Sequence, residues 1–71
     1  MSLSMAEKIR ILLRRKKMTI TDLADILDTS RQNLTNKLNR DNFTEKELQQ
    51  IAKVLQCDFE GFFIFEDGSK I

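Results

Sequence analysis

The sequence has no histidine and a single cysteine, so it lacks the residues that most often perform catalysis or bind transition metals. Histidine is the commonest general base and the commonest metal ligand, and its absence argues against an enzyme. The lone Cys57 can form neither an intramolecular disulfide nor a cysteine zinc site, and it is typical of a reducing compartment. We therefore expect a cytoplasmic protein without catalytic residues, a bound metal or another cofactor.

Proline is also absent, and no apolar run approaches the roughly 20 residues that a membrane span requires. The beginning of the chain has no apolar core of the kind found in signal peptides. Apolar residues nevertheless make up 41% of the 71 residues, which favours a helical domain over a disordered linker. We expect one domain over residues 4–71, with a small core and no room for a small-molecule effector.

Charge is distributed unevenly along the chain. Residues 1–40 hold nine Lys or Arg and four Asp or Glu, whereas residues 41–71 hold three and seven. The two parts therefore carry net charges of +5 and −4, although the whole chain carries only +1. A basic half is typical of a protein that meets a polyanion. The basic run at 14–17 is equally explained as the solvated C-terminal end of a helix, where cations interact favourably with the helix dipole.

Four segments have the pattern of a capped amphipathic helix. Each follows a hydroxyl residue that can accept a hydrogen bond from the first helical turn, namely Ser4, Thr19, Ser30 and Thr44. The apolar spacing after these residues predicts helices over about residues 5–16, 20–27, 31–39 and 45–56. The second and third are separated only by Asp28, Thr29 and the capping Ser30. Residues 19–39 therefore have the layout of a helix-turn-helix.

The third segment has an unusual polar face. Leu34 and Leu38 lie one turn apart and should face inward, while the other side chains are Arg, Gln, Asn, Thr and Lys. Asn and Thr are mediocre helix formers because they compete with the backbone for hydrogen bonds. Asn and Gln can, however, form two hydrogen bonds with adenine, and Arg can do so with guanine. This composition favours a face that reads nucleic acid over a merely polar, solvated one.

The fourth segment is interpreted as structural. Its apolar side chains follow helical spacing at Leu48, Ile51, Ala52 and Leu55. Phe43 precedes the capping residue, and we expect it to pack onto Leu48 as a hydrophobic staple.

The C-terminal segment, residues 58–71, holds four of the five phenylalanines and an Asp-Gly turn signal. We predict a strand or hairpin here, with alternate side chains on opposite faces and the helical core covering one of them. A strand with unpaired edges is a template for pairing, so we expect two copies to pair antiparallel in a homodimer. A short fifth helix at about 59–64 that completes the core of a monomer is the alternative. The residues expected to form the dimer are Phe62, Phe63, Ile64 and Phe65.

The stretch TDLADILDTSRQNL, residues 21–34, resembles the Cro/C1-type (XRE-like) helix-turn-helix family of bacterial and phage regulators. Leu23 and Ala24 match the family's Leu-Ala pair, and the Ser-Arg at 30–31 matches the frequent opening of its recognition helix. Residues 51–57 resemble the end of the family's fourth helix, so the resemblance covers about residues 6–58. It implies a mostly α, four- to five-helix, repressor-like DNA-binding domain.

Three positions depart from the family pattern. Asp28 stands where the turn often has glycine, and Asp tolerates the left-handed conformation better than most residues. Ile20 replaces a frequent Gln, which leaves the first backbone N–H groups of the second helix to bind a phosphate. The family commonly has an apolar residue at the position of Lys37, and the Leu34–Leu38 spacing rotates the third helix slightly. This leaves open whether Asn36 or Lys37 faces the bases.

The resemblance implies a sequence-specific transcriptional repressor that binds double-stranded DNA with its third helix in the major groove. A homodimer would read a pseudo-palindrome with half-sites about 34 Å apart. The residues expected to read bases are Arg31, Gln32, Thr35 and Asn36. Those expected to contact the DNA backbone are Thr19, Ser30, Asn33, Lys37, Asn39, Arg40, Arg15 and Lys17. The alternative is a helix-turn-helix interaction module, antitoxin-like or an adaptor, with weak or no specific DNA binding.

Overall fold

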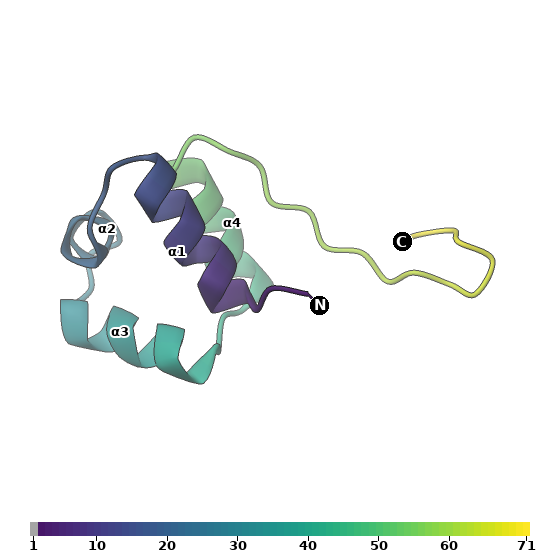
Figure 1. The fold of residues 1–71 in the computed structure, drawn as a ribbon, viewed down its shortest axis with the longest axis horizontal. Helices are drawn as coiled ribbons and strands as arrows, with labels where there is room; N and C mark the ends of the chain where they lie inside the picture. Colours follow the sequence, from purple (N-terminus) through teal and green to yellow (C-terminus); the bar gives the residue numbers. More distant parts are fainter. Residues whose placement is uncertain (1) are drawn as a thin grey trace.

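Four helices and an extended C-terminal tail make up residues 2–71, the part of the chain that the computed structural model describes (Figure 1). The helices are α1 (Met5–Arg15), α2 (Ile20–Ile26), α3 (Arg31–Arg40) and α4 (Glu45–Val54). All four expected helices are confirmed, with ends that differ from the prediction by no more than two residues. The alternative of a fifth helix at 59–64 is wrong, because residues 59–64 are not helical.

Each helix begins after the hydroxyl residue that the sequence pattern predicts. Ser4, Thr19 and Thr44 form complete capping boxes with the carboxylates three residues later. Ser30 caps α3 with its hydroxyl alone, which accepts the Asn33 N–H at 3.0 Å. These bonds satisfy backbone donors that have no partner inside the helix, and they therefore fix where each helix starts.

All four helices end at a non-glycine residue with a left-handed backbone. These residues are Lys17, Asp28, Asp41 and Gln56, with φ between 52° and 57°. After each, the next N–H bonds to the carbonyl five residues earlier, as in the Met18–Leu13 bond of 2.9 Å, which is the pattern of a Schellman motif. Asp28 thus forms the turn between α2 and α3 where the family often has glycine. The fourth helix ends earlier than expected because Gln56 already adopts this conformation.

Replacing Gln56 with glycine is expected to stabilise the domain by about 0.5–1 kcal/mol. A left-handed L-residue costs about 1–2 kcal/mol, and glycine recovers only part of this because it gains flexibility in the unfolded chain. Gln56 is exposed, so the change removes no buried side chain. Urea unfolding measures the difference. The matched control is Gln49→Gly at an exposed position inside α4, which should destabilise by about 1 kcal/mol. Destabilisation by both variants would contradict the prediction.

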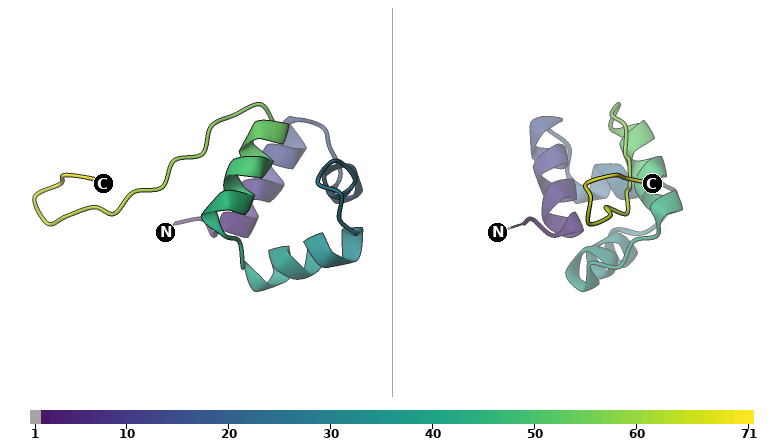
Figure 2. Two further views of the ribbon diagram at one scale, coloured as in Figure 1. Left: turned by 180° about the vertical axis from the view of Figure 1, so that it is seen from behind. Right: turned by 90° about the vertical axis from the view of Figure 1, so that its right-hand side faces the viewer.

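The core lies between the helices, and the buried side chains of residues 2–71 are all apolar. They are Ala6, Ile9, Leu13, Leu23, Ala24, Leu34, Leu38, Leu48, Ile51, Ala52 and Leu55. Leu23 and Ala24 of α2 are fully enclosed, and α2 packs against α3. Phe43 packs half-buried against this core, and its contact with Leu48 as a staple stays a prediction. α3 lies across the ends at which α1 and α4 begin (Figure 2).

The tail leaves the helical body after Phe59 and extends away from it (Figures 1 and 2). The radius of gyration is 13.3 Å, compared with about 11 Å for a compact chain of this length. Phe63 and Ile71 exchange two backbone hydrogen bonds of 2.6 and 3.0 Å, and the Phe65 N–H bonds to the Ser69 carbonyl at 2.8 Å. The prediction of a strand or hairpin is therefore confirmed as a short hairpin, closed by a turn that ends at Gly68 with φ of 89°.

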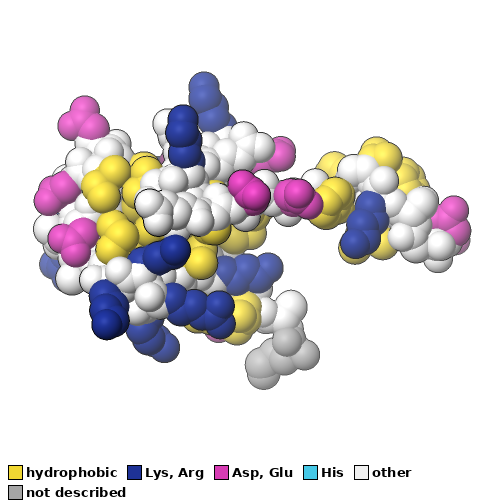
Figure 3. All heavy atoms as spheres, turned by 90° about the horizontal axis from the view of Figure 1, so that it is seen from above, with side chains coloured by type: hydrophobic (Ala, Val, Ile, Leu, Met, Phe, Trp, Pro, Cys, Tyr) yellow, Lys and Arg dark blue, Asp and Glu magenta, His cyan; other side chains and the backbone are white. Residues whose placement is uncertain are grey.

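The expectation that the helical core would cover one face of this segment is wrong. Phe59 already packs against the core near the point where the tail begins, and the hairpin's backbone pairs only with itself. The apolar side chains of the hairpin gather beyond a short acidic connection (Figure 3). Those that remain between 50% and 79% exposed are Phe62, Phe63, Ile64, Phe65 and Ile71.

Candidate nucleic-acid interface

α3 presents a polar face to solvent and is anchored by two leucines on its opposite side. Leu34 and Leu38 are 2% and 3% exposed. Arg31, Gln32 and Asn36 are exposed, and Thr35 is half-buried. The structure thus brings the four candidate base-reading residues onto one helix, with three of them exposed.

Gln32 and Asn36 lie one turn apart and are joined by a hydrogen bond. The Gln32 Nε2 donates to the Asn36 Oδ1 at 3.1 Å. This bond orients both amides and leaves the Gln32 carbonyl and the Asn36 amino group able to bind a ligand. An acceptor beside a donor is the pattern that complements the N6 and N7 edge of adenine.

Thr19 and Ser30, two of the residues expected to contact the DNA backbone, are also the caps of α2 and α3. Their hydroxyl oxygens accept the N–H groups of Asp22 and Asn33, each at 3.0 Å. Each hydroxyl keeps its own O–H for donation to a phosphate oxygen. Asn33, Asn39 and Arg40 are exposed on α3 and add further polar groups to the same helix.

The beginning of α2 is not the open phosphate site that the replacement of Gln by Ile20 suggested. The Asp22 N–H is already bonded to Thr19, and the Asp22 carboxylate accepts the Thr19 N–H at 2.9 Å. Hydrogen bonds from the Thr19 backbone and then its side chain lower the pKa of Asp22, so a negative charge occupies this position. The Asp22 N–H is therefore not available to a phosphate, whereas the Thr19 O–H still is.

Arg15 and Lys17 are not brought next to α3. Both are exposed and lie at the C-terminal end of α1, at the opposite end of the helical body from α3 (Figures 1 and 2). Their assignment to the DNA backbone therefore stays a prediction that this arrangement does not favour. The placement agrees with the alternative interpretation of the basic run as a solvated helix end.

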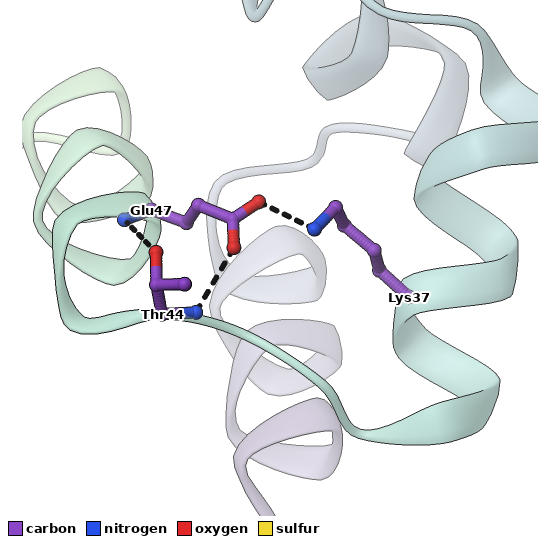
Figure 4. A network of polar contacts seen from close by, with 3 residues as sticks. All are labelled: Lys37, Thr44 and Glu47. Atoms are coloured by element: carbon purple, nitrogen blue, oxygen red, sulfur yellow. Dashed lines mark hydrogen bonds and ion pairs between the residues drawn. The ribbon is translucent and has the colours of Figure 1, made fainter.

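Lys37 points from α3 toward α4 and forms an ion pair with Glu47 (Figure 4). The Lys37 Nζ lies 2.6 Å from the Glu47 Oε2, while the Glu47 Oε1 accepts the Thr44 N–H at 2.9 Å. The hydrogen bond from Lys37, followed by that from the Thr44 backbone, lowers the pKa of Glu47. Lys37 is therefore turned to the neighbouring helix, whereas Asn36 lies exposed beside Gln32. Pairs as accessible as this one contribute about 0–1 kcal/mol to stability.

Asp41 is a residue of this region that sequence reasoning missed. It ends α3, and its Oδ1 accepts the Ala6 N–H of α1 at 2.7 Å. The carboxylate thus satisfies a free donor at the beginning of α1 and joins this helix to the end of α3. Nothing in the sequence indicated a contact between residues this far apart. For Glu47 a partial signal existed, because its capping-box pattern placed the carboxylate at the beginning of α4.

Two short helices joined by a tight left-handed turn, the second polar and exposed, define the helix-turn-helix class of DNA-binding domain. A family model described as the Cro/C1-type HTH DNA-binding domain matches residues 8–68. The chain belongs to this family, which confirms the resemblance seen in its sequence. Neither a curated protein nor a solved structure matches the chain. None of the helices in residues 2–71 has the length and apolar composition needed to cross a membrane.

Proposed function

We propose that the protein is a sequence-specific regulator of transcription that binds double-stranded DNA in the cytoplasm and represses by occupying a promoter. The observation that carries this proposal is the exposed polar face of α3, fixed on two buried leucines within a Cro/C1-type domain. In this proposal α3 enters the major groove with its N-terminal residues toward the base edges. The protein is not an enzyme and needs no cofactor or small-molecule effector.

We assign base reading to the accessible side chains of α3. We assign phosphate contact to the groups around them. Arg31 can form two hydrogen bonds with guanine, and the bonded pair Gln32–Asn36 suits adenine. Contact with a base through its methyl or hydroxyl group is also assigned to the half-buried Thr35. Contact with the DNA backbone is assigned to the cap hydroxyls of Thr19 and Ser30 and to the α3 residues Asn33, Asn39 and Arg40.

The proposal includes a homodimer that forms through the C-terminal hairpin. Because paired residues of an antiparallel hairpin share a face, Phe63 lies on the same face as Phe65 and Ile71. The opposite face carries Phe62 and Ile64, with the Lys70 Nζ 5.4 Å from the centre of the Phe62 ring. A face made of exposed apolar side chains supports burial against a second copy of the chain.

The outer edge of the hairpin supports the same interaction. The N–H groups of Phe63 and Phe65 bond across the hairpin, so those of Phe62 and Ile64 point to the outer edge. Such an edge can pair with its equivalent in a second copy about a two-fold axis. The resulting dimer would read a pseudo-palindrome with half-sites about 34 Å apart.

Selection of the purified protein against randomised duplex DNA at two salt concentrations tests the function. We expect an enriched palindrome and binding that weakens as salt rises, because phosphate contacts release counterions. The exposed hairpin favours one other candidate, an interaction module that dimerises or binds a protein partner in the manner of an antitoxin. Self-association without enrichment of any duplex would support that candidate and contradict the proposed function.

Replacing Arg31 with alanine is expected to weaken binding to the selected duplex by about 1–3 kcal/mol and to relax specificity at one base pair. The reason is that Arg31 begins α3, where side chains reach base edges. Repeating the selection with the variant identifies the position that loses its preference. Arg10→Ala removes the same charge from an exposed position on α1 and should leave the preference intact. An unchanged preference in the Arg31 variant would remove Arg31 from base reading.

A further inference from the structure

We infer that Lys37 acts on DNA binding through Glu47, as a positioning residue that sets the angle of α3 against α4, and does not contact phosphate. This inference rests on the proposed function, because positioning α3 matters only if α3 reads DNA. It revises the sequence-based assignment of Lys37 to the DNA backbone.

The first step is that Glu47 is itself fixed. One carboxylate oxygen accepts the Thr44 N–H at 2.9 Å, and the Glu47 N–H donates to the Thr44 Oγ1 at 3.1 Å. The other oxygen is thereby held toward Lys37, 2.6 Å from its Nζ (Figure 4). A carboxylate whose position is already determined by a helix cap can hold its partner in one geometry, which a freely rotating surface carboxylate cannot.

The second step is that this pair is one of two polar attachments at the C-terminal part of α3. Lys37 ties the helix to α4, and Asp41 ties the end of the helix to α1 through the 2.7 Å bond to Ala6. The preceding part of α3 is held by the turn from α2 and by buried Leu34. Loss of either attachment would let α3 tilt or rotate at one end, and this would move Gln32 and Asn36 relative to the bases.

The third step concerns charge. The Glu47 side chain is 31% exposed and lies beside the helix proposed to bind a polyanion. Lys37 neutralises this carboxylate, and the positive charge of Lys37 is balanced by Glu47 in the same ion pair. An ammonium group that stays paired with Glu47 releases no counterion when DNA binds, so it contributes nothing to the salt dependence of affinity.

The deciding variants are Lys37→Met and Glu47→Asp. Aspartate keeps the net charge and the capping box, as Asp22 does with Thr19 in α2, but its side chain is one methylene too short to hold Lys37. Affinity is measured for the duplex selected by the wild type and for a scrambled duplex, across a range of salt concentrations. Circular dichroism verifies that each variant is folded, and Lys53→Met at an exposed position of α4 is the control for loss of a positive charge.

We expect each variant to bind the selected duplex about three- to tenfold more weakly and the double variant to be no weaker than either single one. The slope of log affinity against log salt should stay unchanged in all variants, whereas loss of a phosphate contact lowers it by about 0.9. A lower slope for Lys37→Met, or undiminished affinity for Glu47→Asp, would overturn the inference and leave the proposed function standing. If the wild-type protein enriches no duplex, the proposed function itself is overturned. The role of Lys37 is then overturned as well, because it rests on that function.

Discussion

Truncating Leu34 to alanine is expected to lower the free energy of unfolding by about 2–5 kcal/mol. Leu34 is 2% exposed and belongs to the core that all four helices share. A domain of this length has a total stability of only about 4–10 kcal/mol, so the variant should lose a large share of it and unfold at a much lower urea concentration. Because Leu34 also anchors α3, DNA binding should be lost together with helical structure.

Urea titration followed by circular dichroism measures this loss. The experiment needs a control variant in which an exposed aliphatic side chain on a helix is shortened in the same way. Ile26→Ala provides one, because Ile26 lies on α2 but is 55% exposed. We expect its effect to stay within about 0.5 kcal/mol of the wild type. Equal losses for the two variants would show that burial of Leu34 contributes nothing beyond its helical position.

Replacing Phe63 with glutamate should convert the proposed dimer into a monomer. Burial of one phenylalanine contributes about 1.5–3 kcal/mol, and a two-fold interface loses this contribution twice. The dissociation constant of the dimer should therefore rise by about 10²- to 10⁴-fold. The melting curve of the helical body should hardly change, because Phe63 is 79% exposed within one chain.

Sedimentation across a range of protein concentrations measures the change in mass. Gln49→Glu alters the net charge in the same way on the helical body and should leave the mass unaltered. A variant that still sediments as a dimer would exclude the hairpin face that contains Phe63 from the interface. A wild-type chain that stays monomeric at every concentration would contradict the dimer itself.

Local signals in the sequence predicted most of the helical body. The Thr19–Asp22 and Thr44–Glu47 boxes are closed by bonds between residues three positions apart, so their pattern alone predicts where α2 and α4 begin. Asp28 was likewise correctly expected to adopt the left-handed turn. The end of α4 was less predictable, because Gln56 gives no signal of a positive φ.

The attachments between helices could not be predicted in this way. Lys37 meets Glu47, and Asp41 meets Ala6, only after the intervening helices have packed. The direction of the tail depended on whether the helical core still had an apolar face for the tail to cover. The alternation of side chains along a strand carries no information about that face. The sequence therefore predicted which residues lie on α3 and which two leucines anchor it, but not the polar attachments at its C-terminal part.

The hairpin extends from the helical body through a short extended connection, residues 60–61, after the half-buried Phe59. In a dimer joined by its hairpins, this connection sets the separation of the two recognition helices. Each residue added or removed there changes the reach of the chain by about 3.3 Å, close to the rise of one base pair. In the proposed dimer, insertions in the connection would therefore change the operator spacing while the reading face and the dimer contact are both kept.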